Sequence, residues 1–258
     1  MKRKWSQNFL FDRNIARKLI SYANLNRKDT VLEIGPGKGI LTQEIIPYVK
    51  RVFAIEIDSG LIDILQSRFF TERKLVLINS DFLKTDLGFL KKFSPLKVIS
   101  SIPYSISTPI IFKLFTIKWE SAILLLQKEL AYRIVAVPYT KDYGALSVNV
   151  QYHCKVEIVR KISRNVFYPR PNVDSAIVRF TPIKRKLKVI DENLFSEIVK
   201  KAFSQRRKKI VNSLSSIYSI PKERLRKLLN SINISTEKRA DQLTINDYIT
   251  LTNAYSKK

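Results

Sequence analysis

The residues with the clearest chemical potential lie between Ser101 and Tyr104, where a hydroxyl, a proline and an aromatic ring follow a short apolar run. The exocyclic amine of adenine is a weak nucleophile, because its lone pair is delocalised into the ring. If the Ser101 hydroxyl and a backbone carbonyl near Ile102 accept its hydrogens, the lone pair turns toward an electrophilic methyl group. Pro103 would stiffen the turn, and Tyr104 would stack on the base. The motif indicates an acceptor site for amine methylation, although ordinary strand-to-helix loops also use these residue types.

A glycine-rich segment earlier in the chain could hold the methyl donor. An apolar, β-branched run predicts a strand over residues 30–34, and helical spacing of Ile and Leu begins at residue 40. Gly35, Gly37 and Gly39 therefore occupy a strand-to-helix turn, where glycine lets backbone amides approach a ligand closely. A dinucleotide site has the same geometry. However, the spacing here is G-x-G-x-G instead of G-x-G-x-x-G, and no later segment predicts hydride transfer.

Two carboxylates follow the next two predicted strands. Glu56 lies near the end of a strand predicted over residues 51–57, where a carboxylate can accept both hydroxyls of a ribose. Asp81 follows a strand predicted over residues 75–78 and could accept from an adenine amino group. A single Asp in a loop is also often solvated or caps a turn.

In this order, the motifs resemble those of the ribosomal RNA adenine dimethyltransferase family, whose members methylate adenines with S-adenosylmethionine and no metal. The match covers most of the chain and includes residues 6–10 (SQNFL), 143–148 (YGALSV), 167–176 (FYPRPNVDSA) and 202–209 (AFSQRRKK). The proline-rich stretch and the F-x-Q-R-R-K element favour the small-subunit (16S-type) branch over the large-subunit enzymes of macrolide resistance. The resemblance implies dimethylation of small-subunit ribosomal RNA during ribosome biogenesis, with the assembling small subunit as partner.

The resemblance also implies roles for individual residues. The donor would be bound by Asn8, Leu10, Gly35, Gly37, Glu56, Asp81 and Ser101. The acceptor adenine would be held by Ser101, Ile102, Pro103 and Tyr104, with Phe167 as a second stacking surface. Adenine within a helix or tight loop hides its amine, so the base must be swung out before it reaches these rings.

One position departs from the family pattern, since the family usually carries Asn where this chain has Ser101. A serine hydroxyl is shorter than an Asn carbonyl and must rotate its own proton away before it accepts. An active variant is the interpretation we favour. An assembly factor that kept the fold and lost turnover, and a large-subunit methyltransferase, stay as alternatives, and a nicotinamide dehydrogenase is the least supported.

The charge of the chain favours a polyanionic partner. Lys and Arg number 47 against 22 Asp and Glu, for a formal net charge of +25. Such an excess is typical of proteins that cover phosphate backbones, and binding should weaken steeply with salt. Residues 183–258 carry 18 basic and 7 acidic side chains, the denser cationic part. Within them, Arg206, Arg207, Lys208 and Lys209 could form a solvated face or an RNA-binding cluster, and the resemblance favours RNA.

Alternating strand and helix patterns predict an α/β fold, a Rossmann-like methyltransferase sheet of parallel strands with helices on both faces. Further strands are expected over residues 96–100, 121–126 and 175–180. A change to charged sequence near Pro182 predicts a catalytic domain over residues 1–182 and a small all-α domain that binds RNA over residues 183–258. Residues 146–152 alternate like a strand, but the resemblance implies a helix there.

Other site types find little support in the sequence. Cys154 is the single cysteine and His153 the single histidine, so no structural zinc set or internal disulfide is expected. As sequence neighbours they rarely face each other, which argues against a catalytic dyad. No long apolar run predicts a membrane span, and the start lacks the apolar stretch of a secretion signal. We therefore expect a cytoplasmic, monomeric protein that binds RNA and no membrane.

Overall fold

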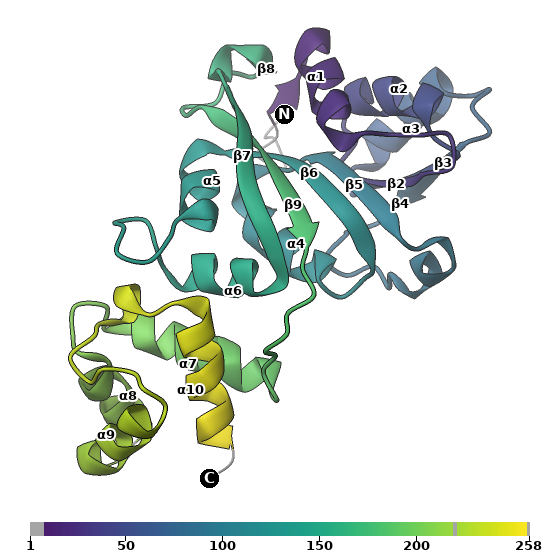
Figure 1. Ribbon diagram of the computed structural model, residues 1–258. Helices are drawn as coiled ribbons and strands as arrows, with labels where there is room; N and C mark the ends of the chain where they lie inside the picture. Colours follow the sequence, from purple (N-terminus) through teal and green to yellow (C-terminus); the bar gives the residue numbers. More distant parts are fainter. Residues whose placement is uncertain (1–7, 219–220, 257–258) are drawn as a thin grey trace. The chain divides into compact units, whose positions relative to one another are not determined.

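The structure is a computed structural model that describes residues 8–218 and 221–256 (Figure 1). The chain folds into two units. Unit 1 comprises Met1–Ala131 and Lys155–Pro182, and unit 2 comprises Tyr132–Cys154 and Ile183–Lys258. The chain thus leaves unit 1, contributes a segment to unit 2, and returns before the final helices.

Unit 1 is built on a seven-stranded sheet with the order β4-β3-β2-β5-β6-β9-β7. The strands are β2 (Thr30–Ile34), β3 (Arg51–Glu56), β4 (Leu75–Asn79), β5 (Leu96–Ser101), β6 (Trp119–Gln127), β7 (Cys154–Ile162) and β9 (Ser175–Pro182). Strands β4, β3, β2, β5 and β6 pair in parallel, as expected, whereas β9 runs antiparallel to β6. The sequence analysis expected the strand β9 without its antiparallel direction, and it did not predict β7.

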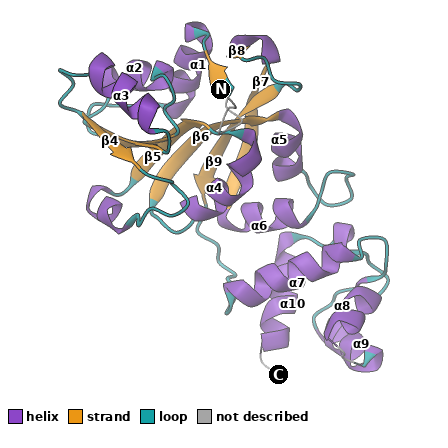
Figure 2. Ribbon diagram, turned by 180° about the vertical axis from the view of Figure 1, so that it is seen from behind, coloured by secondary structure: helices purple, strands orange, loops and turns teal. Residues whose placement is uncertain are grey.

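Helices cover both faces of this sheet (Figure 2). The α-helices between residues 13 and 135 are α1 (Arg13–Ala23), α2 (Ile40–Ile45), α3 (Ser59–Arg68), α4 (Ser107–Leu114) and α5 (Lys128–Val135). Val31 and Ile99 share an apolar cluster with Leu19 of α1 and with residues of α2. Their sequence neighbours on the opposite face, such as Leu32, are also fully buried. Because successive strand residues point to opposite faces, burial of both sets in β2 and β5 means that both faces are covered at the centre of the sheet.

A short two-stranded ribbon lies outside the main sheet. Strand β1 (Phe9–Leu10) pairs antiparallel with β8 (Phe167–Tyr168), so that Phe9 faces Tyr168 and Leu10 faces Phe167. The ribbon joins the start of the described chain to the proline-rich stretch near residue 170. The sequence analysis did not anticipate it, since neither strand is long enough to show a period.

Unit 2 is helical. It contains α6 (Ala145–His153), α7 (Glu192–Ser204), α8 (Ile210–Tyr218), α9 (Lys222–Ser231) and α10 (Ile245–Ser256). The helix expected over residues 146–152 from the family resemblance is confirmed as α6. Its residues Val148 and Tyr152, one helical turn apart, share a buried core with Phe195 of α7 and Tyr248 of α10. This packing corrects the predicted domain limits, because residues 132–154 belong with the helices and not with the sheet.

Candidate active site

A cavity of about 350 Å³ opens at the carboxyl ends of β2, β3, β4 and β5 in unit 1. Parallel strands direct these ends to one edge of the sheet, where ligands of open α/β folds bind. Seven of the residues that the sequence predicted for the site line this cavity: Asn8, Gly35, Gly37, Glu56, Asp81, Ser101 and Pro103. Segments far apart in the sequence therefore converge as expected. Ser6 and Gln7 of the predicted amino-terminal element lie outside the described residues.

The glycine turn after β2 adopts backbone geometry that other residues rarely accept. Gly35, Gly37 and Gly39 have φ angles of +65°, +58° and +80°. A Cβ atom at Gly37 would lie 3.1 Å from the Phe9 ring, which also lines the cavity. A Cβ atom at Gly39 would lie 2.7 Å from the Phe69 ring, so this third glycine serves packing between α2 and α3. Gly35 and Gly37 thus line the cavity, whereas Gly39 allows α2 and α3 to pack closely next to it.

Glu56 is held rigidly at the cavity wall. Its Oε2 atom accepts from the Gly37 amide at 3.1 Å, and Oε1 accepts from the amides of Ile57 at 2.9 Å and Asp58 at 3.1 Å. Burial raises the pKa of this carboxyl, and the three backbone hydrogen bonds oppose that shift. A carboxylate offers about four acceptor positions, so one position remains for a hydroxyl of a ligand.

Asp81 both closes a turn and lines the cavity. Its Oδ1 atom accepts from the Leu83 amide at 2.9 Å, the local bond that fixes an Asx turn. The two interpretations of this residue are therefore compatible, since one carboxylate can serve the turn and still face a ligand.

The acceptor motif begins at the last residue of β5. Ser101 and Pro103 line the cavity, and the loop is fixed by hydrogen bonds from Ser100 Oγ to the Ile34 carbonyl and from Ser107 Oγ to the Pro103 carbonyl. Tyr104 is half-buried, and its hydroxyl is hydrogen-bonded to Ser175 Oγ on β9. Burial raises the pKa of Tyr104 above its ordinary value, so the hydroxyl stays protonated. Tyr104 is not among the residues that line the cavity.

Three further predicted site residues are buried instead of lining the cavity. Ile102 is 2% exposed, Phe167 3% and Leu10 6%. Leu10 and Phe167 are cross-strand partners in the β1–β8 ribbon and belong to the apolar cluster beneath α1. Their neighbour Phe9, which the sequence analysis gave no role, lines the cavity in place of Leu10. Neighbouring strand residues point to opposite sides, but two-residue strands carry no sequence signal that would have separated Phe9 from Leu10.

Comparisons with known proteins identify the family. A family model described as "Ribosomal RNA adenine dimethylase" matches residues 1–257. The chain belongs to this family. "Ribosomal RNA small subunit methyltransferase A" of Clostridioides difficile (strain 630) is 40% identical over 259 residues, covering 98% of this chain and 90% of that protein. The protein of the same name from Alkaliphilus metalliredigens (strain QYMF) is 42% identical over 254 residues, covering 95% and 88%.

Solved structures of the family share the fold. A dimethyladenosine transferase from Plasmodium falciparum superposes with a TM-score of 0.81 at 30% identity, covering 96% of this chain and 98% of that one. The 23S rRNA methyltransferase ErmE superposes with a TM-score of 0.72 at 26% identity, covering 96% and 100%. The expected Rossmann-like methyltransferase sheet with surrounding helices is thereby confirmed.

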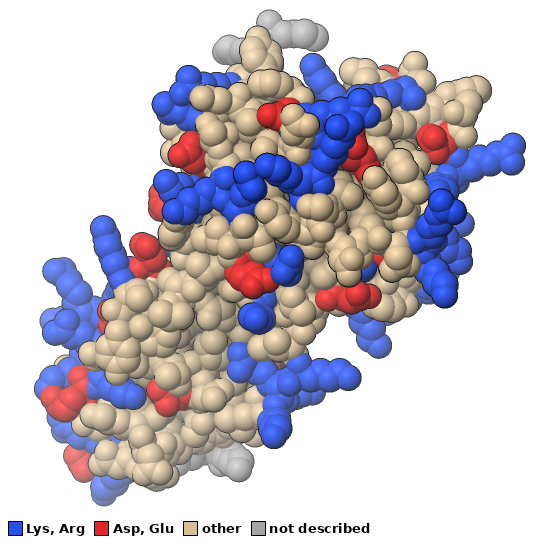
Figure 3. All heavy atoms as spheres, turned by 45° about the horizontal axis from the view of Figure 1, so that its top comes forward, with Lys and Arg blue, Asp and Glu red and all other residues tan. Residues whose placement is uncertain are grey.

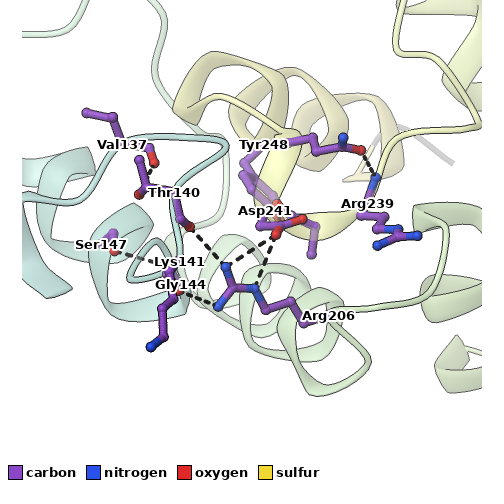
Figure 4. Close-up of polar contacts among 11 residues, drawn as sticks. Val137, Thr140, Lys141, Gly144, Ser147, Arg206, Arg239, Asp241 and Tyr248 are labelled. Atoms are coloured by element: carbon purple, nitrogen blue, oxygen red, sulfur yellow. Dashed lines mark hydrogen bonds and ion pairs between the residues drawn. The ribbon is translucent and has the colours of Figure 1, made fainter.

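The family's F-x-Q-R-R-K element lies in unit 2, and its first arginine faces inward. Arg206 donates to the carbonyl of Lys141 at 2.7 Å, to the carbonyl of Thr140 at 3.0 Å, and to Asp241 Oδ2 at 3.3 Å (Figure 4). Asp241 in turn accepts a backbone hydrogen bond from Tyr139 through its own carbonyl. The guanidinium therefore ties the loop before α6 to the turn before α10, and the RNA contact expected for Arg206 stays a prediction beside this structural role.

The rest of this basic element is more exposed. Lys209 forms an ion pair with Glu237, and its backbone bridges to Arg239. Arg207 and Lys208 are both exposed. They are the members of the predicted RNA-binding cluster whose position best suits a contact with phosphate.

A second carboxyl beside the glycine turn was not singled out from the sequence. Glu33 is 1% exposed, its Oε2 atom accepts from Thr42 Oγ1 at 2.7 Å, and its Oε1 atom has no hydrogen-bond partner among the described residues. Burial raises its pKa to about 8, so the group is mostly protonated at neutral pH. Glu33 therefore links β2 to α2 through Thr42 and does not line the cavity.

Within the described residues, no helix is long and apolar enough to cross a membrane. The same residues contain no group of three His, Cys, Asp or Glu side chains arranged to hold a metal ion. The Cys154 thiol is buried and donates to the Val150 carbonyl at 3.3 Å. Burial raises the pKa of this thiol to about 12, which argues against a nucleophilic role.

Proposed function

We propose that this chain is an S-adenosylmethionine-dependent enzyme that dimethylates the exocyclic amine of adenines in small-subunit ribosomal RNA during ribosome biogenesis. The observation that carries the proposal is one cavity with two kinds of wall. The glycine turn, Glu56 and Asp81 form one wall, and Ser101 with Pro103 forms the other. Membership of the ribosomal RNA adenine dimethylase family supports the substrate class.

The donor wall fits S-adenosylmethionine. A volume of about 350 Å³ falls in the usual range of small-molecule pockets. Gly35 and Gly37 leave room for the methionine end, the remaining acceptor position of Glu56 suits a ribose hydroxyl, and Asp81 suits the adenine amine. When bound there, S-adenosylmethionine supplies an electrophilic methyl group on a sulfonium.

The acceptor wall positions the amine. Ser101 Oγ and a carbonyl near Ile102 accept the two amine hydrogens, which directs the nitrogen lone pair into the cavity. Pro103 holds the turn. Tyr104, whose hydroxyl is bonded to Ser175 and which does not line the cavity, must bring its ring to the base when RNA binds if it is to stack there and meet the positive charge that develops on the nitrogen. Because Phe167 is buried beside Leu10, its proposed stacking role requires β8 to shift when RNA binds.

The electrostatics suit an RNA substrate. On the face drawn in Figure 3, basic side chains are widely spread and acidic ones are fewer, in line with the formal charge of +25. We propose that Arg207 and Lys208 contact phosphates of the assembling small subunit. We also propose that the protein acts in the cytoplasm as a monomer.

The alternative of a factor without turnover is motivated by Ser101, which stands where the family usually has Asn. Incubation of immature small subunits with labelled S-adenosylmethionine separates the two functions. We expect label in dimethyladenosine after digestion of the small-subunit RNA, and none with an isolated large subunit. Donor binding without label, unchanged in a Ser101→Asn variant, would overturn the enzyme proposal.

A further inference from the structure

The β1–β8 ribbon sorts its aromatic residues onto two faces. Leu10 and Phe167 are paired and buried in the core of unit 1. Phe9 and Tyr168 form the adjacent pair, and cross-strand partners share a face of the ribbon. The Phe9 ring lines the cavity, whereas Tyr168 is 69% exposed. An exposed tyrosine therefore lies beside a ring of the cavity wall.

The same face continues along the chain. The Phe11 amide donates to the Val166 carbonyl at 3.1 Å, which extends the ladder by one step, and the Phe11 side chain is 59% exposed. Strand alternation puts Phe11 on the side of Phe9. We call Phe9, Phe11 and Tyr168 the aromatic ribbon. A single exposed apolar side chain needs no explanation, but several large ones gathered on one surface often mark a binding site.

Positive charge flanks the aromatic ribbon. The Lys38 ammonium lies 5.5 Å from the centroid of the Phe9 ring, and Lys38 itself is exposed. Arg170, two residues beyond Tyr168, is also exposed. Aromatic faces interleaved with basic side chains form the usual surface for unpaired nucleotides, because the rings stack on bases while the charges meet the phosphates.

We propose that the aromatic ribbon is a stacking platform for an unpaired nucleotide next to the adenine that enters the cavity. The proposal rests on the proposed function for the identity of the RNA. Phe9 links the platform to the cavity, so a base stacked on Tyr168 would help hold the strand while its neighbour is extruded. Stacking tolerates any base, so the platform positions the RNA without reading its sequence.

The test compares Tyr168→Ala with Tyr168→Phe, which keeps the ring. Tyr48→Ala is the matched control, because Tyr48 is also exposed, at 54%, and lies outside the cavity lining. Methyl transfer to immature small subunits gives KM and kcat. We expect Tyr168→Ala to raise KM for the RNA about tenfold, the scale of one lost base–aromatic stack, with donor affinity unchanged. Tyr168→Phe and Tyr48→Ala should match the native protein.

Binding of a fluorescent single-stranded oligoribonucleotide keeps the test independent of turnover. If the native protein transfers no methyl group, the proposed function fails, and the platform is still judged by whether Tyr168→Ala weakens this binding. Unchanged KM and unchanged oligonucleotide affinity in Tyr168→Ala would overturn the platform. An equal loss in Tyr168→Phe would also overturn it, because the ring face would then not be the contact.

Discussion

Glu56 in the cavity of unit 1 and Arg206 in the basic element of unit 2 are both charged side chains fixed by backbone groups, yet they serve different ends. Glu56 accepts from three amides and still lines the cavity. Arg206 donates to two carbonyls and to Asp241, and these partners lie within unit 2. Backbone partners alone therefore do not decide the role of a charged residue in a motif, and what distinguishes Glu56 is that it also lines a cavity.

Loss of the Glu56 charge should give the largest effect. In Glu56→Gln we expect affinity for S-adenosylmethionine to fall by roughly two orders of magnitude, since a charge-assisted hydrogen bond to a ribose hydroxyl is weakened and the side-chain amide disturbs the backbone bonds that fix residue 56. Isothermal titration calorimetry measures it, with Asp63→Asn, an exposed carboxylate of α3, as control. If Glu56→Gln binds the donor as tightly as the native chain, Glu56 has a structural role, like Arg206, and does not bind the donor.

Glu33 provides a second comparison with Glu56 within unit 1. It is a buried carboxyl next to the same glycine turn, but it does not line the cavity. Its pKa is about 8 in the folded chain against an ordinary value of 4.5. Its contribution to stability is therefore complete below pH 4.5 and is lost as the pH rises toward 8, because only the unfolded chain releases the proton early.

Relative to Glu33→Gln, the native chain should lose on the order of a few kcal/mol of unfolding free energy between pH 5 and 8. Urea unfolding at a series of pH values gives the difference. Parallel curves for the two proteins would mean that Glu33 is ionised in the fold.

Arg206 and Arg207 form a natural pair of variants for unit 2. Arg206→Ala should cost about 2 kcal/mol of stability, since two carbonyls and Asp241 lose their donor. Arg206→Lys should recover little of it, because an ammonium lacks the planar fork. Arg207→Ala should leave the urea midpoint unchanged. If folded Arg206→Ala loses affinity for RNA without losing stability, the predicted contact between Arg206 and RNA would be supported instead.

The smallest effects should come from the exposed charges. Arg207→Ala and Lys208→Ala should each weaken binding to small-subunit RNA a few-fold and reduce the slope of log affinity against log salt by about one. Fluorescence anisotropy across a salt series tests this. Affinity that does not respond to either substitution would move the RNA surface away from the basic element.

The strand ends of the cavity were predictable because each is encoded locally. An apolar run followed by glycine or a carboxylate marks β2, β3 and β4, and parallel strands bring those ends together. Strand β7 was missed because it is an edge strand whose alternation is diluted by Lys and Arg. The direction of β9 and the packing of residues 132–154 depend on long-range contacts that no local period carries.

The side chains of the site show the same limit. Arg206 and Asp241 are far apart in sequence, so nothing in the basic run revealed their ion pair. Leu10 and Phe167 were assigned from family motifs, whereas the two-residue strands that bury them are too short to be recognised. Motifs thus located the cavity, and only the tertiary structure separated the residues that face it from those that support it.

The claim that donor and acceptor share one cavity is tested most directly by single-turnover methyl transfer in Ser101→Ala. The native chain should convert adenine of immature small subunits to dimethyladenosine. At saturating donor we expect the variant to be slower by roughly a hundredfold, because the amine is no longer oriented. An undiminished rate in Ser101→Ala would show that the amine is positioned elsewhere and would contradict the account.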